Sequence, residues 1–99
     1  MIIQMSEKYI AIQHNIEPIK QHITRVIDNW FYPNSLKCML LRKFISIYRG
    51  YISTIEEHYL HTKEPEILRL LDSSIKTLRE FEYKFNEIYM DYIESKLCC

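Results

Sequence analysis

A histidine pair with adjacent glutamates near the middle of the chain is the first candidate for chemistry. The stretch EEHYLH places Glu57, His58 and His61 at positions i, i+1 and i+4, so Glu57 and His61 would share one face of a helix. Side chains of these types on one helix face can hold a divalent metal ion. The H-E-x-x-H order of a metalloprotease is absent, however. We therefore expect His58 to be a structural residue beside a turn, and we predict no metal site and no cofactor.

Cysteine side chains are the second candidates. The chain has three of them, Cys38 and the terminal pair Cys98 and Cys99. An odd number with two adjacent residues does not make a disulfide framework, which predicts a reducing, cytoplasmic location. The chain has no C-a-a-X box for lipid attachment, so we expect free thiols at the terminal pair. Cys38 lies near the start of a predicted helix, whose dipole can lower a thiol pKa, but no histidine partner is identifiable.

Basic side chains gather in one acid-free segment. No acidic residue lies between Asp28 and Glu56, and the basic residues there are Lys37, Arg42, Lys43 and Arg49. Basic residues on one helix face can contact the phosphates of a nucleic acid, which makes a nucleic-acid-binding regulator our alternative hypothesis. The chain as a whole has 13 basic and 13 acidic residues, so no net charge draws it to a polyanion. We expect the basic side chains to pair within the molecule or across a dimer.

Aromatic residues are frequent in the last third of the chain. Five of them form our predicted partner-binding surface: Phe81, Tyr83, Phe85, Tyr89 and Tyr92. Tyrosine-rich helical faces are typical of protein interfaces. The expected partner is another protein or a second copy of the chain.

One acidic residue breaks the apolar pattern in the same region. Glu82 falls within the apolar arc beside Leu78 and Phe85, where a carboxylate must be paired or displaced to the edge. We expect it to form an ion pair at the edge of the arc with a basic residue of another helix. A catalytic role is not supported, because no second carboxylate can be placed opposite it.

The first part of the chain contains a proline within an otherwise helical pattern. Apolar residues recur there with alternating spacings of 3 and 4, and they keep their phase across Pro18: Ile2, Met5, Tyr9, Ile12, Ile16, Ile19, Ile23, Val26 and Trp30. Such a heptad seam predicts one helix over residues 2–31, kinked near Pro18. The alternative is a break at Asn15, which is a good N-cap residue for a new helix with Pro18 in its first turn.

Two further breaks divide the rest of the chain. The stretch YPNS predicts a turn at Pro33, with Asn34 or Ser35 as the N-cap of a helix over residues 36–61. The stretch HTKEPE predicts a second turn, with Thr62 as the N-cap and Pro65 in the first turn of a helix over residues 64–97. Three amphipathic helices with short connections predict an all-α, antiparallel up-down-up bundle in a single domain. The alternative is a four-helix bundle with a break near Asn15–Pro18.

Enzymatic function has little support in the sequence. With Gly50 as the single glycine, the chain has no phosphate-binding loop, nucleophile elbow or dinucleotide fingerprint. No apolar run is long enough to cross a membrane. We therefore predict a non-enzymatic protein–protein interaction module of the adaptor, chaperone, immunity or inhibitor type. We expect residual apolar surface on a thin bundle to be covered by a homodimer or by another protein.

Overall fold

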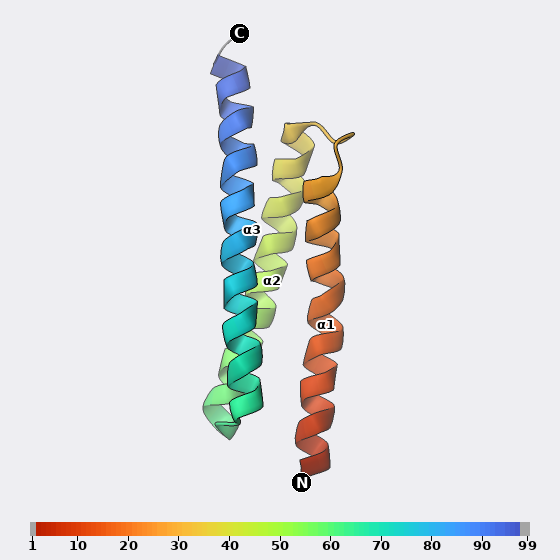
Figure 1. Ribbon diagram of the computed structural model, residues 1–99, viewed down its shortest axis with the longest axis vertical. Helices are drawn as coiled ribbons and strands as arrows, with labels where there is room; N and C mark the ends of the chain where they lie inside the picture. Colours follow the sequence, from red (N-terminus) through yellow and green to blue (C-terminus); the bar gives the residue numbers. More distant parts are fainter. Residues whose placement is uncertain (1, 98–99) are drawn as a thin grey trace.

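Three α-helices follow one another along the chain and alternate in direction (Figure 1): α1 (Ile2–Asp28), α2 (Asn34–Thr62) and α3 (Pro65–Leu97). The computed structural model describes the backbone of residues 2–97 and the side chains of residues 11–97. Two sets of predictions lie outside the described residues: the burial of the side chains of Ile2, Met5 and Tyr9, and the free thiols of Cys98 and Cys99. The predicted all-α bundle of three helices is confirmed.

Helix α1 runs through Pro18 without a break. Ile16 on one side of the proline and Ile23 and Val26 on the other are all buried, while Pro18 itself is exposed. The missing backbone N–H therefore faces solvent, where its loss is tolerated, and burial of the seam holds both halves in phase. The prediction of one continuous helix is confirmed. The four-helix alternative with a break near Asn15 is wrong.

The end of α1 differs from the prediction. The helix ends at Asp28, and the side-chain oxygen of Asn29 accepts a hydrogen bond from the backbone N–H of Phe31 at 3.0 Å. An asparagine that binds the backbone two residues further on forms a local turn that competes with the helix. Trp30, predicted as the last residue of the buried seam, is therefore 79% exposed.

The predicted caps of the two turns need similar corrections. Pro33 is the N-cap of α2, in extended conformation and without a side-chain cap, so α2 begins at Asn34 rather than after it. Thr62 is the last residue of α2, not the N-cap of α3, although its hydroxyl accepts a hydrogen bond from the N–H of Glu64 at 3.4 Å. Lys63 closes α2 in the left-handed region at φ 56°, and its N–H donates to the carbonyl of Tyr59. Pro65 begins α3 as predicted, because the first helical turn does not need its N–H.

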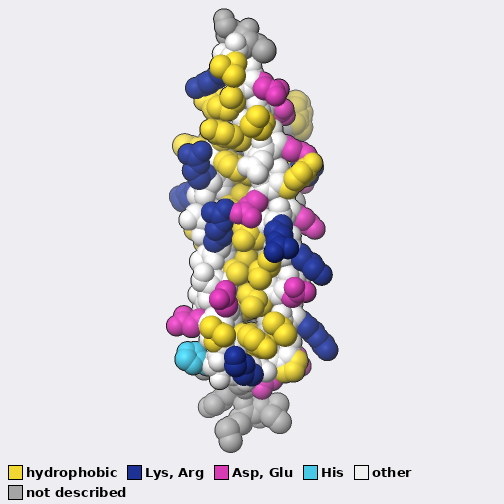
Figure 2. Space-filling view, turned by 90° about the vertical axis from the view of Figure 1, so that its left-hand side faces the viewer, with side chains coloured by type: hydrophobic (Ala, Val, Ile, Leu, Met, Phe, Trp, Pro, Cys, Tyr) yellow, Lys and Arg dark blue, Asp and Glu magenta, His cyan; other side chains and the backbone are white. Residues whose placement is uncertain are grey.

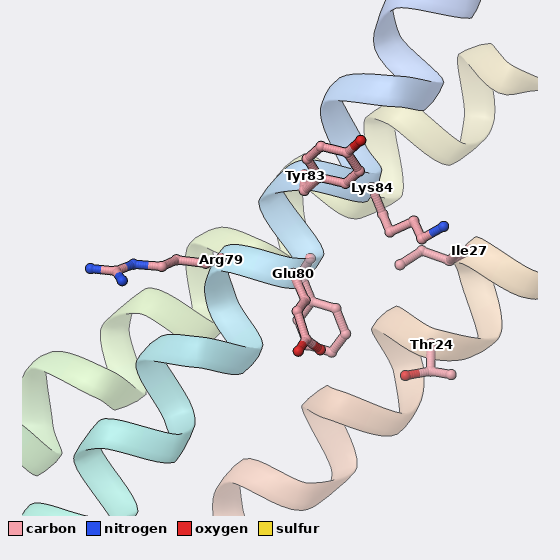
Figure 3. A pocket seen from close by; sticks show the side chains of 7 residues that line it. Thr24, Ile27, Arg79, Glu80, Tyr83 and Lys84 are labelled. Atoms are coloured by element: carbon pink, nitrogen blue, oxygen red, sulfur yellow. The ribbon is translucent and has the colours of Figure 1, made fainter.

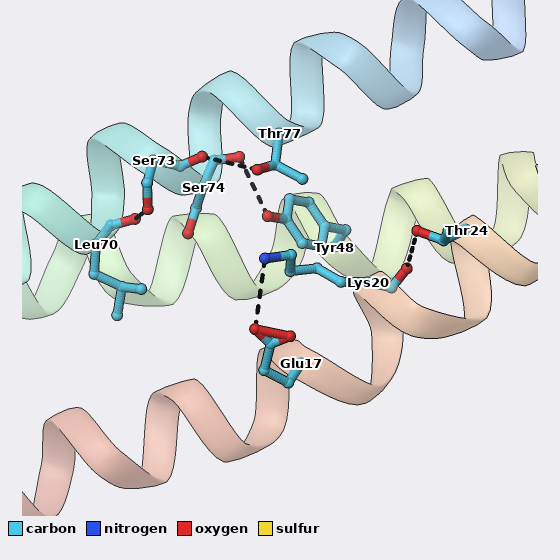
Figure 4. A network of polar contacts seen from close by, with 8 residues as sticks. All are labelled: Glu17, Lys20, Thr24, Tyr48, Leu70, Ser73, Ser74 and Thr77. Atoms are coloured by element: carbon cyan, nitrogen blue, oxygen red, sulfur yellow. Dashed lines mark hydrogen bonds and ion pairs between the residues drawn. The ribbon is translucent and has the colours of Figure 1, made fainter.

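Helix α2 is the middle of the molecule and packs against both neighbours, whereas α1 and α3 contact each other little. Its fully buried side chains are Leu41, Tyr48 and Ile55. Tyr48 meets the ring of Phe81 edge-on at 5.7 Å. Its hydroxyl donates to the backbone carbonyl of Ser74 at 3.3 Å (Figure 4), and burial raises the pKa of this hydroxyl. One buried tyrosine thus fixes α3 against α2 by packing and by a hydrogen bond.

The bundle is long and thin. It measures 61 × 21 × 15 Å, with a radius of gyration of 16.3 Å, where a compact chain of this length has about 13 Å. The accessible surface is 7204 Å², against about 6,000 Å² for a compact monomer of this mass. The fold therefore leaves more surface uncovered than a globular chain of the same size.

Candidate functional site

A groove runs between the first half of α2 and the last half of α3. It encloses about 540 Å³, and we name it the α2–α3 groove. The residues that line it are Ser35, Cys38, Met39, Arg42, Lys43, Ser46, Tyr89 and Tyr92. Two residues of the predicted partner-binding surface and two of the predicted nucleic-acid-binding residues thus lie side by side, although they are far apart in the sequence.

Aromatic rings and cations contact one another in and beside the groove. Phe85 and Tyr89 stack with ring centroids 5.9 Å apart, and the Arg42 guanidinium lies 6.0 Å from the ring of Phe85. Further along α3, the Lys96 amine lies 4.7 Å from the ring of Tyr92, and a hydrogen bond with Tyr92 raises the pKa of this amine. The residues sit one helical turn apart on α3, so the fold itself aligns them. The surface offers flat apolar rings edged with positive charge.

The five predicted partner-binding residues do not share one environment. Phe81 is only 8% exposed and belongs to the core, so it cannot contribute to an exposed surface. Tyr83 is exposed but does not line the groove, and it lies instead at a hollow next to α1. Tyr89 and Tyr92 line the groove, and Phe85, which is partly buried, stacks on Tyr89 beside it. The structure therefore brings together three of the five residues.

The four predicted nucleic-acid-binding residues are also divided. The Lys37 amine donates a hydrogen bond to the backbone carbonyl of Ile27 at 2.9 Å, near the end of α1. Arg49 forms an ion pair with Glu82 of α3, which confirms the predicted pairing of Glu82 with a basic residue of another helix. Arg42 and Lys43 remain on the wall of the groove.

Cys38 does not lie in surroundings that activate a thiol. Cys38 is buried near the start of α2, and burial raises the pKa of its thiol more than the nearby Arg42 charge lowers it. Desolvation of the charged thiolate is thus the larger of the two effects. A buried thiol that stays protonated is a poor nucleophile.

The histidine pair near the end of α2 does not assemble a metal site. Among the residues whose side chains are described, no group of three potential ligands comes together. Glu57 and His61 are exposed, whereas His58 is partly buried, and its Nε2 atom is buried without a hydrogen-bond partner. His58 therefore packs beside the turn, away from the two side chains with which it would bind a metal.

A second hollow lies between α1 and α3, where these helices diverge. It encloses about 500 Å³. In Figure 3, the Lys84 side chain reaches toward Ile27 of α1, while Arg79 extends away from the hollow. No set of convergent acids, bases or nucleophiles lines it, so the hollow offers no evident chemistry.

The exposed aromatic pair in the turn between α1 and α2 was missed by sequence reasoning. Trp30 and Phe31, in the turn between α1 and α2, are exposed and stack with ring centroids 3.9 Å apart. The signal that could have revealed them is the pair of turn residues Asn29 and Pro33 on either side.

No helix in the described part of the chain contains a stretch apolar enough to span a bilayer. Comparison of the chain with protein families, curated proteins and solved structures finds no match.

Proposed function

We propose that this protein is a non-enzymatic protein-binding module whose binding surface is the α2–α3 groove together with the exposed side chains of α3 beside it. The observation that carries the proposal is the meeting of aromatic rings, methionines and cations on one accessible face. Met39 and Met90 are 62% and 54% exposed, and Tyr89 and Arg42 lie between α2 and α3 on the same groove. Tyrosine, methionine and arginine are the residue types enriched in protein interfaces.

Residue chemistry also supports this proposal over catalysis. Protein-binding energy is concentrated in a few tyrosine, tryptophan and arginine side chains surrounded by packing contacts. Methionine adapts its shape to a partner. Adaptors, chaperones, immunity proteins and inhibitors can all act through a surface of this kind.

The proposed function is tested by photo-crosslinking in the cells from which the chain comes. A benzophenone amino acid replaces Tyr89 in one variant. In the control variant it replaces Arg69, an exposed residue near the start of α3. We expect Tyr89 to give a discrete adduct with another polypeptide or with a second copy, and Arg69 to give none. Absence of a discrete adduct at Tyr89, or equal adducts at both positions, would contradict the proposal.

The nucleic-acid alternative has weaker support. Lys37 and Arg49 make contacts within the chain, which leaves Arg42 and Lys43 as the basic residues of the groove. Two cations give little of the counterion release that drives binding to a polyanion. We expect no mobility shift of DNA or RNA at low salt, and a salt-sensitive shift would favour the alternative.

A further inference from the structure

A second pattern, of four apolar residues and one asparagine, runs along α3 apart from the residues that face the core. Its members are Tyr83, Asn86, Met90, Ile93 and Leu97, with alternating spacings of 3 and 4. We name this pattern the outer seam. Tyr83, Met90 and Leu97 are 64%, 54% and 80% exposed, and Ile93 is partly exposed and is not among the residues packed on the core cluster. Nothing in the described part of the chain covers the outer seam.

We propose that the outer seam pairs with the outer seam of a second copy, with the two α3 helices parallel. This inference rests on the proposed function and names the partner of the same surface. Spacings of 3 and 4 keep side chains in a line along a helix, which is the pattern by which two helices pack on each other. The seam from Tyr83 to Leu97 extends over about 21 Å at 1.5 Å per residue, or two heptads.

The uncovered surface is large enough for such a pairing. The accessible surface of 7204 Å² exceeds that of a compact monomer by about 1,200 Å². A stable interface removes about 800 Å² from each partner. The excess is spread over the whole elongated molecule, and a pairing of ordinary size along α3 would remove an area of the same order.

The charges at the two edges of this face decide the direction of pairing. On α2, Arg42 and Lys43 form a basic edge. On the far side of α3, Glu87, Asp91 and Glu94 are exposed at spacings of 4 and 3 and form an acidic edge. Figure 2 shows the same layout in the upper half of the molecule, where hydrophobic side chains lie between Lys and Arg at the left and Asp and Glu at the right.

A two-fold axis along the helices brings the basic edge of each copy opposite the acidic edge of the other. A two-fold axis across the helices would instead bring like charges together at both edges, which is unfavourable. The positions of the charges along the helix axis agree with the two-fold axis along the helices. Arg42 lies beside Phe85, and Glu87 and Asp91 follow within two turns of α3. The charge layout therefore favours two parallel copies.

The polar residues near the outer seam are compatible with a parallel pair. Glu82 would lie close to Glu87 of the second copy. Each of these two carboxylates already has an ion-pair partner in its own chain, Arg49 for Glu82 and Lys84 for Glu87, which offsets this one contact between like charges. Asn86 would lie close to Asn86 of the second copy, and an amide side chain can both donate and accept a hydrogen bond. Neither residue leaves an unmatched group at the interface.

Disulfide trapping tests the proposal and its direction. Single cysteines replace Tyr83, Leu97 or, as a control, Glu80, which is exposed, lies three residues before Tyr83 and is not a member of the outer seam. Cys98 and Cys99 are changed to serine in every variant. Each variant is oxidised alone, and the Tyr83→Cys and Leu97→Cys chains are also mixed. A disulfide needs Cα atoms within about 7 Å, and the two seam positions are about 21 Å apart along the helix.

Parallel pairing predicts disulfide dimers of Tyr83→Cys alone and of Leu97→Cys alone, at least tenfold faster than for Glu80→Cys. Mixed disulfides without same-site dimers at both positions would show antiparallel pairing and overturn the proposal. Equally slow oxidation at all three positions would show random collision and also overturn it. In that last case, an adduct of Tyr89 with a different polypeptide would leave the proposed binding function intact, so the two failures are distinguishable.

Discussion

Arg49 of α2 and Glu82 of α3 form an ion pair that links these two helices. The Arg49 side chain is 57% exposed and the Glu82 side chain 35%, so water screens the attraction. The pair lines a hollow beside Phe85 and Asn86, and it neutralises a carboxylate at the edge of the apolar arc of α3.

A double-mutant cycle measures what this ion pair contributes. We expect Arg49→Ala, Glu82→Ala and the double variant to give a coupling free energy of about 0.2–1 kcal/mol in urea unfolding, as is typical of exposed pairs. The coupling should fall at high salt, because counterions screen exposed charges. The same cycle with Arg69 in place of Arg49 is the control and should show no coupling. A coupling of several kcal/mol that does not respond to salt would be inconsistent with an exposed pair.

Gly50 lies in the middle of α2 and is exposed. A Cβ atom added there would have nothing within 4 Å. We expect Gly50→Ala to raise the free energy of unfolding by about 0.5–1 kcal/mol, because glycine has more backbone freedom to lose in a helix than alanine. Thermal unfolding should shift upward by about 4–8 °C per kcal/mol for a chain of this size. Ser46→Ala, on the exposed part of the same helix, is the matched control and should give a smaller gain. A destabilised Gly50→Ala variant would refute this reading of α2.

Tyr48 provides a test of the contact between α2 and α3. We expect Tyr48→Phe to lower the free energy of unfolding by about 1 kcal/mol, because the hydrogen bond to the Ser74 carbonyl is lost while the packing on Phe81 remains. Burial raises the pKa of Tyr48 in the folded state. Above about pH 10, the usual tyrosine pKa, the unfolded chain loses the phenol proton while the folded chain keeps it. Stability therefore falls with rising pH in the wild type.

The same urea measurements repeated at alkaline pH complete this test. The difference in unfolding free energy between the wild type and Tyr48→Phe should shrink above about pH 10, because the variant lacks the titrating group. The other tyrosines are shared by both proteins and cancel in the comparison. A difference that grows with pH would have the wrong sign.

Cys38 is expected to react slowly with thiol reagents. Its thiol is buried and its pKa is raised by burial, and the thiolate is the reactive form. In a background with Cys98 and Cys99 changed to serine, Ellman's reagent should react with Cys38 at least tenfold faster after unfolding in urea. A cysteine placed at the exposed Ser46, with Cys38 changed to serine, should react quickly in the folded protein. Fast reaction of Cys38 in the folded state would show that the groove reaches its thiol.

Much of the fold could be predicted because burial dominates it. The phase of Ile16, Ile23 and Val26 across Pro18 predicted a continuous α1, and the structure buries all three. The end of α1 could not be predicted from the same pattern, because the turn at Asn29 depends on a local hydrogen bond that periodicity does not register. Trp30 fits the seam by spacing alone and still lies in solvent.

The candidate surface was harder to predict than the helices. Sequence reasoning identified Tyr89, Tyr92, Arg42 and Lys43 as two separate sets, since only the antiparallel packing of α2 and α3 brings them to one groove. It also placed Phe81 on the exposed surface, because a wide apolar arc does not show which of its residues face the neighbouring helix. Helix α2 packs against both α1 and α3. Its apolar pattern likewise does not show which residues face which of the two neighbouring helices.

The mass of the protein in solution tests most directly whether the exposed half of α3 is an interface. Sedimentation velocity should be measured at several micromolar concentrations for the wild type, for Met90→Glu in the outer seam, and for Arg69→Glu as a matched control on the same helix. We predict a dimer for the wild type and for Arg69→Glu. We predict a monomer of 12.1 kDa for Met90→Glu, with unchanged helical circular dichroism, because Met90 is exposed in the single chain and a buried unpaired charge would oppose pairing. A wild type that remains a monomer at every concentration, or a Met90→Glu variant that still dimerises, would contradict the account.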